Sequence, residues 1–184
     1  MTDPVVIVGM ARTAMGGMQG MFSGLSVTEL GSNAIKGALA DAGIDGEAVD
    51  EVLMGCVLPA GTGQAPARQA AIGAGLPNSV PCTTLNKVCG SGMKTVMMGH
   101  DAILAGSASI VVAGGMESMT NAPYMMPQGR GGYRFGHGEL LDHMLYDGLQ
   151  DAYAGGPMGG FAESCADKYE FTREQQDAYA IESL

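Results

Sequence analysis

Charged residues, basic ones above all, and long apolar runs are scarce in this sequence, and each shortage excludes a class of protein. Only 15% of the 184 residues are charged while 46% are hydrophobic, a balance that disordered chains do not have. The apolar runs fall far short of the ~20 residues that a membrane-spanning helix requires, so no membrane partner is expected. Lysine and arginine number 9 against 19 acidic residues, a net charge of −10, which disfavours nucleic acid as a partner.

Cysteine is also sparse, and its spacing excludes two kinds of small domain. The four cysteines, Cys56, Cys82, Cys89 and Cys165, form no Cys-x-x-Cys pair, so neither a disulfide framework nor a zinc ribbon is expected. The amino-terminal stretch MTDPVVIVG has an early acid and an apolar run too short for a signal or transit peptide. Both observations favour a cytoplasmic location.

Metal and nucleotide signatures are missing from the sequence as well. His137 and His143 lie six residues apart, which cannot place both on one face of a helix as a zinc pair requires, and His100 stands alone. The stretch GSGMKT at 90–95 has no Gly-Lys pair, and GTGQAP at 61–66 ends on proline where a dinucleotide-binding loop needs its last glycine. We therefore expect neither a metal nor a bound cofactor.

The sequence does contain an alternation of short apolar runs and amphipathic segments, which predicts an α/β fold with a parallel sheet. Ser26 and Glu29 form a capping box that opens a helix, and Gly43 follows its end. Further helices are expected over 66–74, beginning at Pro66, over 93–104 and over 161–169. A second capping box, Thr172 with Gln175, is expected to open a last helix. Strands are expected over 5–8, 51–57, 82–85 and 110–113.

The composition changes after Gly115, which divides the chain into two parts. Residues 120–160 are rich in glycine, proline and methionine without strand periodicity, as expected of a loop-rich segment that serves as a lid or an assembly surface. The final helix has an apolar face but no capping residue after it, so we expect the chain to be cut there. We therefore expect an incomplete α/β domain over 1–119 and the truncated beginning of an inserted loop domain over 120–184.

The stretch most informative about chemistry is the turn that leads from the strand at 82–85 into the helix at 93–104. Here the sequence LNKVCGSGMK places Cys89 at the opening of a helix, and we expect the chain to turn sharply through Gly90 and Gly92. The free amides of a helix N-terminus favour a thiolate and can hold an oxyanion, and small residues let an acyl substrate approach the backbone. A buried, inert thiol is the alternative on residue type alone. The position at the turn favours a nucleophile, whereas the other three cysteines are interpreted as structural.

Three stretches of the chain resemble the thiolase family: ARTAMGG at 11–17, LNKVCGSGMKTVMMGHDAI at 85–103 and AGGMESMTNAPY at 113–124. The likeness is greater to acetyl-CoA acetyltransferases than to ketoacyl synthases. It implies a thiolase-like α/β fold and acyl transfer between coenzyme A thioesters, with Cys89 as the acyl-carrying nucleophile. The family's activating histidine, second cysteine and oxyanion-hole asparagine lie in its second half, so the resemblance also implies a fragment that is inactive alone.

The resemblance assigns weaker roles to other residues. Leu149 and Met158 match positions that line the pantetheine channel, although Pro157 stands where the family often has histidine. Arg130 and Arg134 match a loop for tetramer contact near the coenzyme A phosphates, or are two solvated arginines. Glu117 matches a buried acid, which we interpret as a structural hydrogen-bonding strut. A homo-oligomer, dimer or tetramer, is implied for the full-length form. A non-catalytic truncated product and a ketoacyl-synthase-like condensing enzyme remain the alternatives.

Overall fold

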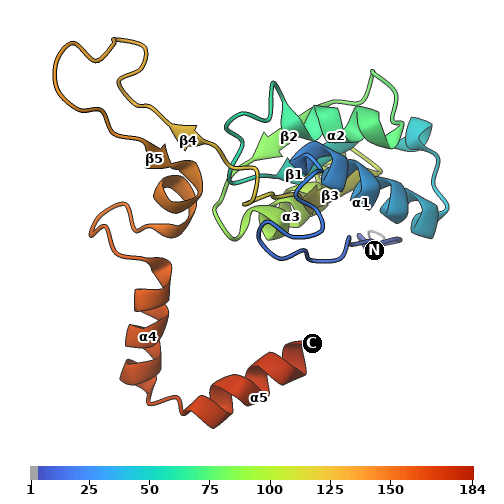
Figure 1. Cartoon of the computed structure of the whole chain (residues 1–184). Helices are drawn as coiled ribbons and strands as arrows, with labels where there is room; N and C mark the ends of the chain where they lie inside the picture. The colour runs from blue at the N-terminus through green and yellow to red at the C-terminus, as the bar shows by residue number, and fades with distance from the viewer. Residues whose placement is uncertain (1–3) are drawn as a thin grey trace.

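A three-stranded parallel sheet lies at the centre of the computed structural model, which describes residues 4–184 (Figure 1). Its strands are β1 (Glu51–Gly55), β2 (Cys82–Leu85) and β3 (Val111–Gly115), in the order β2-β1-β3. Val52 of β1 lies opposite Cys82 on one side and Val112 on the other. The central strand is buried along Val52–Gly55, as expected of a parallel strand covered on both faces.

Helices cover both faces of this sheet. The two helices α1 (Val27–Ala42) and α2 (Pro66–Ala74) pack on each other on one face, and α3 (Ser91–Leu104) packs on the other (Figure 1). The buried apolar core joins α1 and α2 to β1, and its members include Ile35, Val52, Met54 and Leu76. This arrangement confirms the α/β fold that the alternating sequence pattern predicts.

Both predicted ends of α1 and the predicted start of α2 are confirmed, whereas α3 begins at Ser91 and not at residue 93. Ser26 and Glu29 form the reciprocal hydrogen bonds of a capping box before α1, and Gly43 closes this helix in the left-handed conformation at φ 66°. Pro66 occupies the first turn of α2, where its missing N–H costs nothing. A short 3₁₀ helix (Gly46–Ala48) leads from α1 into β1.

The predicted strand at residues 5–8 is wrong. These residues have no assigned secondary structure and pair with no strand, and Ile7 keeps 75% of its surface exposed. A cavity of about 480 Å³, lined by residues 5–11, by β3 and by apolar residues of α1 and α3, separates the segment from the sheet. A strand needs a neighbouring strand for its ladder of hydrogen bonds, and residues 5–8 join none in the described chain.

Residues 120–184 extend away from the sheet (Figure 1). The segment holds a two-residue antiparallel pair, β4 (Tyr124–Met125) and β5 (Leu141–Asp142), a π-helix (Met144–Leu149), α4 (Met158–Tyr169) and α5 (Arg173–Ser183). Between residues 120 and 157 the regular structure is limited to the two short strands and the π-helix, so the segment is rich in loops, as the composition predicts. A capping box of Thr172 and Gln175 opens α5 as predicted. No residue of α4 or α5 is buried.

The helices offer no membrane crossing. In the stretch from residue 4 to residue 184, none combines the length with the apolar composition that a span of the bilayer requires.

Candidate active site

Cys89 lies in the turn between β2 and α3, at the carboxyl end of the parallel sheet. We call residues 86–90 of this turn the elbow. The thiol is exposed, and the N-cap of α3, Gly90, follows it directly. In open parallel sheets this edge is where ligands bind, because loops that follow neighbouring strands meet there. The structure thus places Cys89 where the sequence predicts it, beside the opening of a helix.

The sharp turn of the elbow is made by Val88 and not by a glycine. Val88 has φ 47°, in the left-handed region, whereas Gly90 has φ −88°. A β-branched residue in this region is a conformational outlier. The expectation that Gly90 and Gly92 form the turn is therefore wrong, since the strained residue comes immediately before the cysteine.

Glycines instead allow α3 to approach the strand ends closely. A Cβ atom built on Gly55 would lie 2.7 Å from Cβ of Ser91 in the first turn of α3. Gly92 lies against Gly114 and Gly115 at the end of β3, where a Cβ on Gly115 would be 3.4 Å from Cα of Gly92. Gly92 was expected to give an acyl substrate access to the backbone, and in the structure it allows α3 to pack closely on the end of β3.

Cys56 and Glu117 form a second polar group at the same edge of the sheet. The buried Cys56 thiol lies 3.7 Å from Oε1 of Glu117, whose carboxylate also accepts hydrogen bonds from the amides of Val57 at 2.8 Å and Leu58 at 3.0 Å. Burial, and then the negative charge of Glu117, raise the pKa of the Cys56 thiol to about 12. Cys56 is therefore an inert thiol. Glu117 is the hydrogen-bonding strut that the sequence indicates, although the residue is exposed rather than buried.

The remaining cysteines differ from each other. Cys82 is half-buried in β2, and burial raises the pKa of its thiol. Cys165 is exposed on α4, so the expectation of a buried thiol at this position is wrong. Exposure alone therefore does not distinguish Cys89 from Cys165, and what sets Cys89 apart is its position on the elbow.

The four residues assigned to coenzyme A all lie in the segment that extends from the sheet. Leu149 ends the π-helix and is half-buried, and Met158 opens α4 with 41% of its surface exposed. Arg130 and Arg134 are exposed, and within the described residues neither side chain makes a hydrogen bond or an ion pair. None of the four is hydrogen-bonded to the elbow in that part of the chain, so their roles stay predictions.

Sequence reasoning missed the part that His143 plays. This residue is 5% exposed, its Nδ1 lies 2.5 Å from Oδ2 of Asp147, and the amide of Ala60 donates to its Nε2 at 3.4 Å. An Nε2 that accepts leaves the ring proton on Nδ1, which points at Asp147. His143 thereby ties the segment after residue 120 to the loop after β1. The i, i+4 spacing of a histidine and an aspartate was the available signal.

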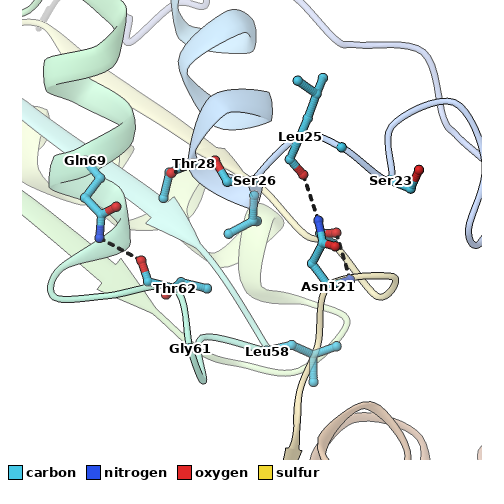
Figure 2. A pocket seen from close by; sticks show the side chains of 12 residues that line it. Ser23, Leu25, Ser26, Thr28, Leu58, Gly61, Thr62, Gln69 and Asn121 are labelled. Carbon is cyan, nitrogen blue, oxygen red and sulfur yellow. Dashed lines mark hydrogen bonds between the residues drawn. The ribbon is translucent and has the colours of Figure 1, made fainter.

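A cavity of about 390 Å³ opens at the amino end of α1 (Figure 2). Most of its polar groups already have partners: the Asn121 amide donates to the Leu25 carbonyl at 2.8 Å, and the Gln69 amide donates to the Thr62 carbonyl at 2.9 Å (Figure 2). Cys89 lines neither this cavity nor the one beside residues 5–11. Among residues 4–184, no three histidine, cysteine or acidic side chains gather closely enough to hold a metal ion.

Comparison with known proteins defines the class to which this fold and this elbow belong. Residues 5–184 match the N-terminal domain of thiolases, and the chain belongs to the thiolase family. It is 58% identical to acetyl-CoA acetyltransferase 2 of Arabidopsis thaliana over 98% of this chain and 45% of that protein. It is 55% identical to the acetyl-CoA acetyltransferase of Schizosaccharomyces pombe over 97% of this chain and 45% of that protein.

A solved structure agrees with the fold. The crystal structure of Acat5 thiolase from Ascaris suum in complex with coenzyme A superimposes with a TM-score of 0.89 at 44% identity, over 96% of this chain and 46% of that chain. The chain therefore spans about half the length of the relatives that it matches. The thiolase-like α/β fold implied by the sequence motifs is confirmed.

Proposed function

We propose that this chain carries the nucleophile half of an acetyl-CoA C-acetyltransferase active site, with Cys89 as the residue that is acylated. The observation that carries the proposal is the exposed thiol on a strained elbow at the carboxyl end of the sheet, in a chain of the thiolase family. The acetyl-CoA acetyltransferases among its relatives support coenzyme A thioesters as the substrates.

In the first step the thiolate of Cys89 attacks the carbonyl carbon of an acyl-CoA. The carbon–sulfur bond to coenzyme A breaks, the thiolate of coenzyme A leaves and takes up a proton, and the acyl group stays on Cys89. The backbone amide of Cys89, next to the N-terminus of α3, is suited to donate a hydrogen bond to the oxyanion of the tetrahedral intermediate. No cofactor takes part in this step.

In the second step a second acetyl-CoA loses a proton from its methyl group, and the resulting carbanion attacks the acyl-cysteine to give a 3-ketoacyl-CoA. Thiolysis is this reaction in reverse. The base that removes the methyl proton and the anion hole for the enolate belong, in this proposal, to the part of the relatives that this chain does not span.

The rest of the chain has a proposed division of labour. Residues 1–119 form the nucleophile-bearing part of an α/β domain, and residues 120–184 begin the loop domain that covers the substrate. Leu149 and Met158 would line the channel for the pantetheine arm, which is neutral and suits apolar walls. Arg130 and Arg134, exposed in an acidic chain, are suited to coenzyme A phosphates. A homo-oligomeric full-length form and a cytoplasmic location are part of the same proposal.

Intact-mass measurement after incubation with acetyl-CoA tests the acylation step. We expect one acetyl group per chain, located on Cys89 by peptide mapping, and none on the Cys89→Ser variant at the same protein concentration. The exposed Cys165 is the control within the same chain. Acetylation of Cys165 to the same extent as Cys89 would show that exposure alone accounts for the reaction, and the proposal would be wrong.

A further inference from the structure

The strained residue Val88 is held by hydrogen bonds on both of its peptide groups. The hydroxyl of Ser91 accepts from the amide of Lys87 at 2.8 Å and donates to the carbonyl of Val88 at 2.6 Å. The amide of Val88 donates to Oδ1 of Asn86 at 2.9 Å. Backbone in a sparsely populated region persists only where its surroundings fix it, and here two side chains do so.

Ser91 is the more firmly placed of the two side chains. It is 4% exposed, and its Cβ lies so close to Gly55 that a side chain on Gly55 would collide with it. Its hydroxyl hydrogen and one lone pair are both used within the elbow. A buried serine that closes a ring with Lys87 and Val88 fixes the direction in which the chain enters Cys89.

Asn86 connects the elbow to the loop after β1. Its Nδ2 donates to the carbonyl of Val57 at 3.3 Å, while the amide of Val57 donates to Glu117 at 2.8 Å. Glu117 follows β3, Val57 follows β1 and Asn86 follows β2. One hydrogen-bonded chain thus runs across the carboxyl ends of all three strands and ends at the residue before Cys89.

We propose that Ser91 and Asn86 are positioning residues for Cys89, which hold Val88 in its left-handed conformation and so aim the thiol outward for attack. The inference rests on the proposed function, since it takes Cys89 as the nucleophile. Neither residue touches the substrate in this proposal. Both act through the backbone of Val88, and Glu117 supports Asn86 through the loop after β1.

Alkylation by iodoacetamide, followed by peptide mapping, measures how readily the Cys89 thiol reacts, and it requires no acyl-CoA. The readout is the labelling rate of Cys89 divided by that of Cys165 in the same chain, across a range of pH. We expect Ser91→Ala to lower this ratio several-fold and to change its pH profile. Cys165 lies on a helix without buried residues and reports the reactivity of an exposed thiol in the same sample. A ratio that Ser91→Ala leaves unaltered would overturn the proposal.

A glycine at position 88 provides the decisive comparison, because glycine adopts a positive φ without strain. In a Val88→Gly background, Ser91→Ala should lower the labelling ratio of Cys89 to Cys165 much less than it does in the wild type. The difference between the two backgrounds is the coupling between the residues. Equal losses in both would show that Ser91 does not act through Val88.

Asn86 allows the same test at an exposed position, where a variant that fails to fold is of less concern. Asn86→Ser keeps an oxygen that can accept from the amide two residues later, and Asn86→Ala does not. We expect Asn86→Ala to lower the labelling ratio and Asn86→Ser to restore most of it. Equal ratios in the two variants would contradict the proposal.

The outcomes separate this inference from the proposed function. Fast labelling of Cys89 that depends on Ser91 and Asn86, without acetylation by acetyl-CoA, would overturn the proposed function and leave the positioning role intact. Acetylation of Cys89 with a labelling ratio indifferent to both residues would do the reverse.

Discussion

Cys56 and Cys89 lie at the same edge of the sheet but differ in exposure. Cys56 directly follows β1, and Cys89 lies four residues after the end of β2. Cys56 is buried beside the carboxylate of Glu117, and both the burial and the charge disfavour a thiolate. Cys89 is exposed and borders the first turn of α3. These environments favour Cys89 over Cys56 as the proposed nucleophile, and Cys56 contributes to the packing and contacts Glu117.

The raised pKa of Cys56 predicts how the stability depends on pH. The folded state keeps the thiol protonated up to about 12, whereas the unfolded chain releases the proton near 9.0. Stability from this group is complete below pH 9 and is lost as the pH rises toward 12, by up to about 1.4 kcal/mol per pH unit. Denaturant titrations at pH 8 to 11 should show a shallower decline for Cys56→Ala than for the wild type. Parallel declines would show that Cys56 is not the group responsible.

Gly90 is predicted to matter for the approach of the substrate and not for the fold. A Cβ at this position would lie 3.5 Å from the Lys87 carbonyl oxygen and 4.0 Å from Cδ of Lys87, and φ is −88°. Gly90→Val should therefore leave thermal unfolding near the wild type while it slows acetylation of Cys89 about tenfold or more, which corresponds to ~1.4 kcal/mol of barrier. Gly90→Ala is the matched control with less bulk. Unfolding of the valine variant would show that the glycine is structural.

At the scale of elements, the packing of α3 on β1 depends on the absence of a side chain at Gly55. A Cβ there would lie 2.7 Å from Cβ and 2.8 Å from the carbonyl carbon of Ser91, and backbone atoms cannot move aside cheaply. Gly55→Ala should destabilise the protein by about 1–3 kcal/mol and slow the labelling of Cys89 as Ser91 shifts.

The control for that prediction is Gly160→Ala in α4, where an added Cβ meets nothing within 4 Å. In a helix this change should stabilise by about 0.5–1 kcal/mol. Denaturant titrations of both variants give the two free energies of unfolding. A neutral Gly55→Ala variant would mean that α3 adjusts its position on the sheet without loss.

Elements with local signals were predictable from the sequence, and those that depend on distant partners were not. The capping boxes at Ser26 and Thr172 and the proline that opens α2 are local, and each is confirmed. The strand expected at 5–8 needs a pairing partner, which the described chain does not provide. The left-handed turn was misassigned to glycine because the side chains that hold Val88 cannot be read from spacing alone.

At the scale of the whole molecule, large apolar side chains remain uncovered on several elements. Val6, Ile7 and Val8 are more than half exposed, and Met93 and Leu104 on α3 are exposed to a similar degree. Exposed apolar surface of this extent usually marks a face that another part of a protein covers. The chain spans 45% of each of two acetyl-CoA acetyltransferase relatives. We infer that these apolar side chains would be covered by a segment corresponding to the part of those relatives that the chain does not match.

The activity of the 184-residue chain by itself follows from its proton-transfer groups. Carbon–carbon bond formation needs a base for the acetyl methyl proton and an anion hole for the enolate. In the proposed reaction Cys89 carries the acyl group at this stage and so cannot also act as the base. The buried imidazole of His143 is engaged with Asp147 and the amide of Ala60, and the Cys56 thiol is held protonated.

We therefore expect no measurable acetoacetyl-CoA synthesis or thiolysis from these 184 residues, with slow single acetylation of Cys89 visible by mass spectrometry. Addition of the second half of a thiolase, as one chain or a co-expressed fragment, should restore turnover, and Cys89→Ser should abolish it again. A spectrophotometric assay of thiolysis with the isolated chain provides the direct check. Robust thiolysis by the isolated chain would show that the site is complete within residues 1–184. The base would then have to come from His143 or another group on this chain, and a site divided between two halves would be the wrong description.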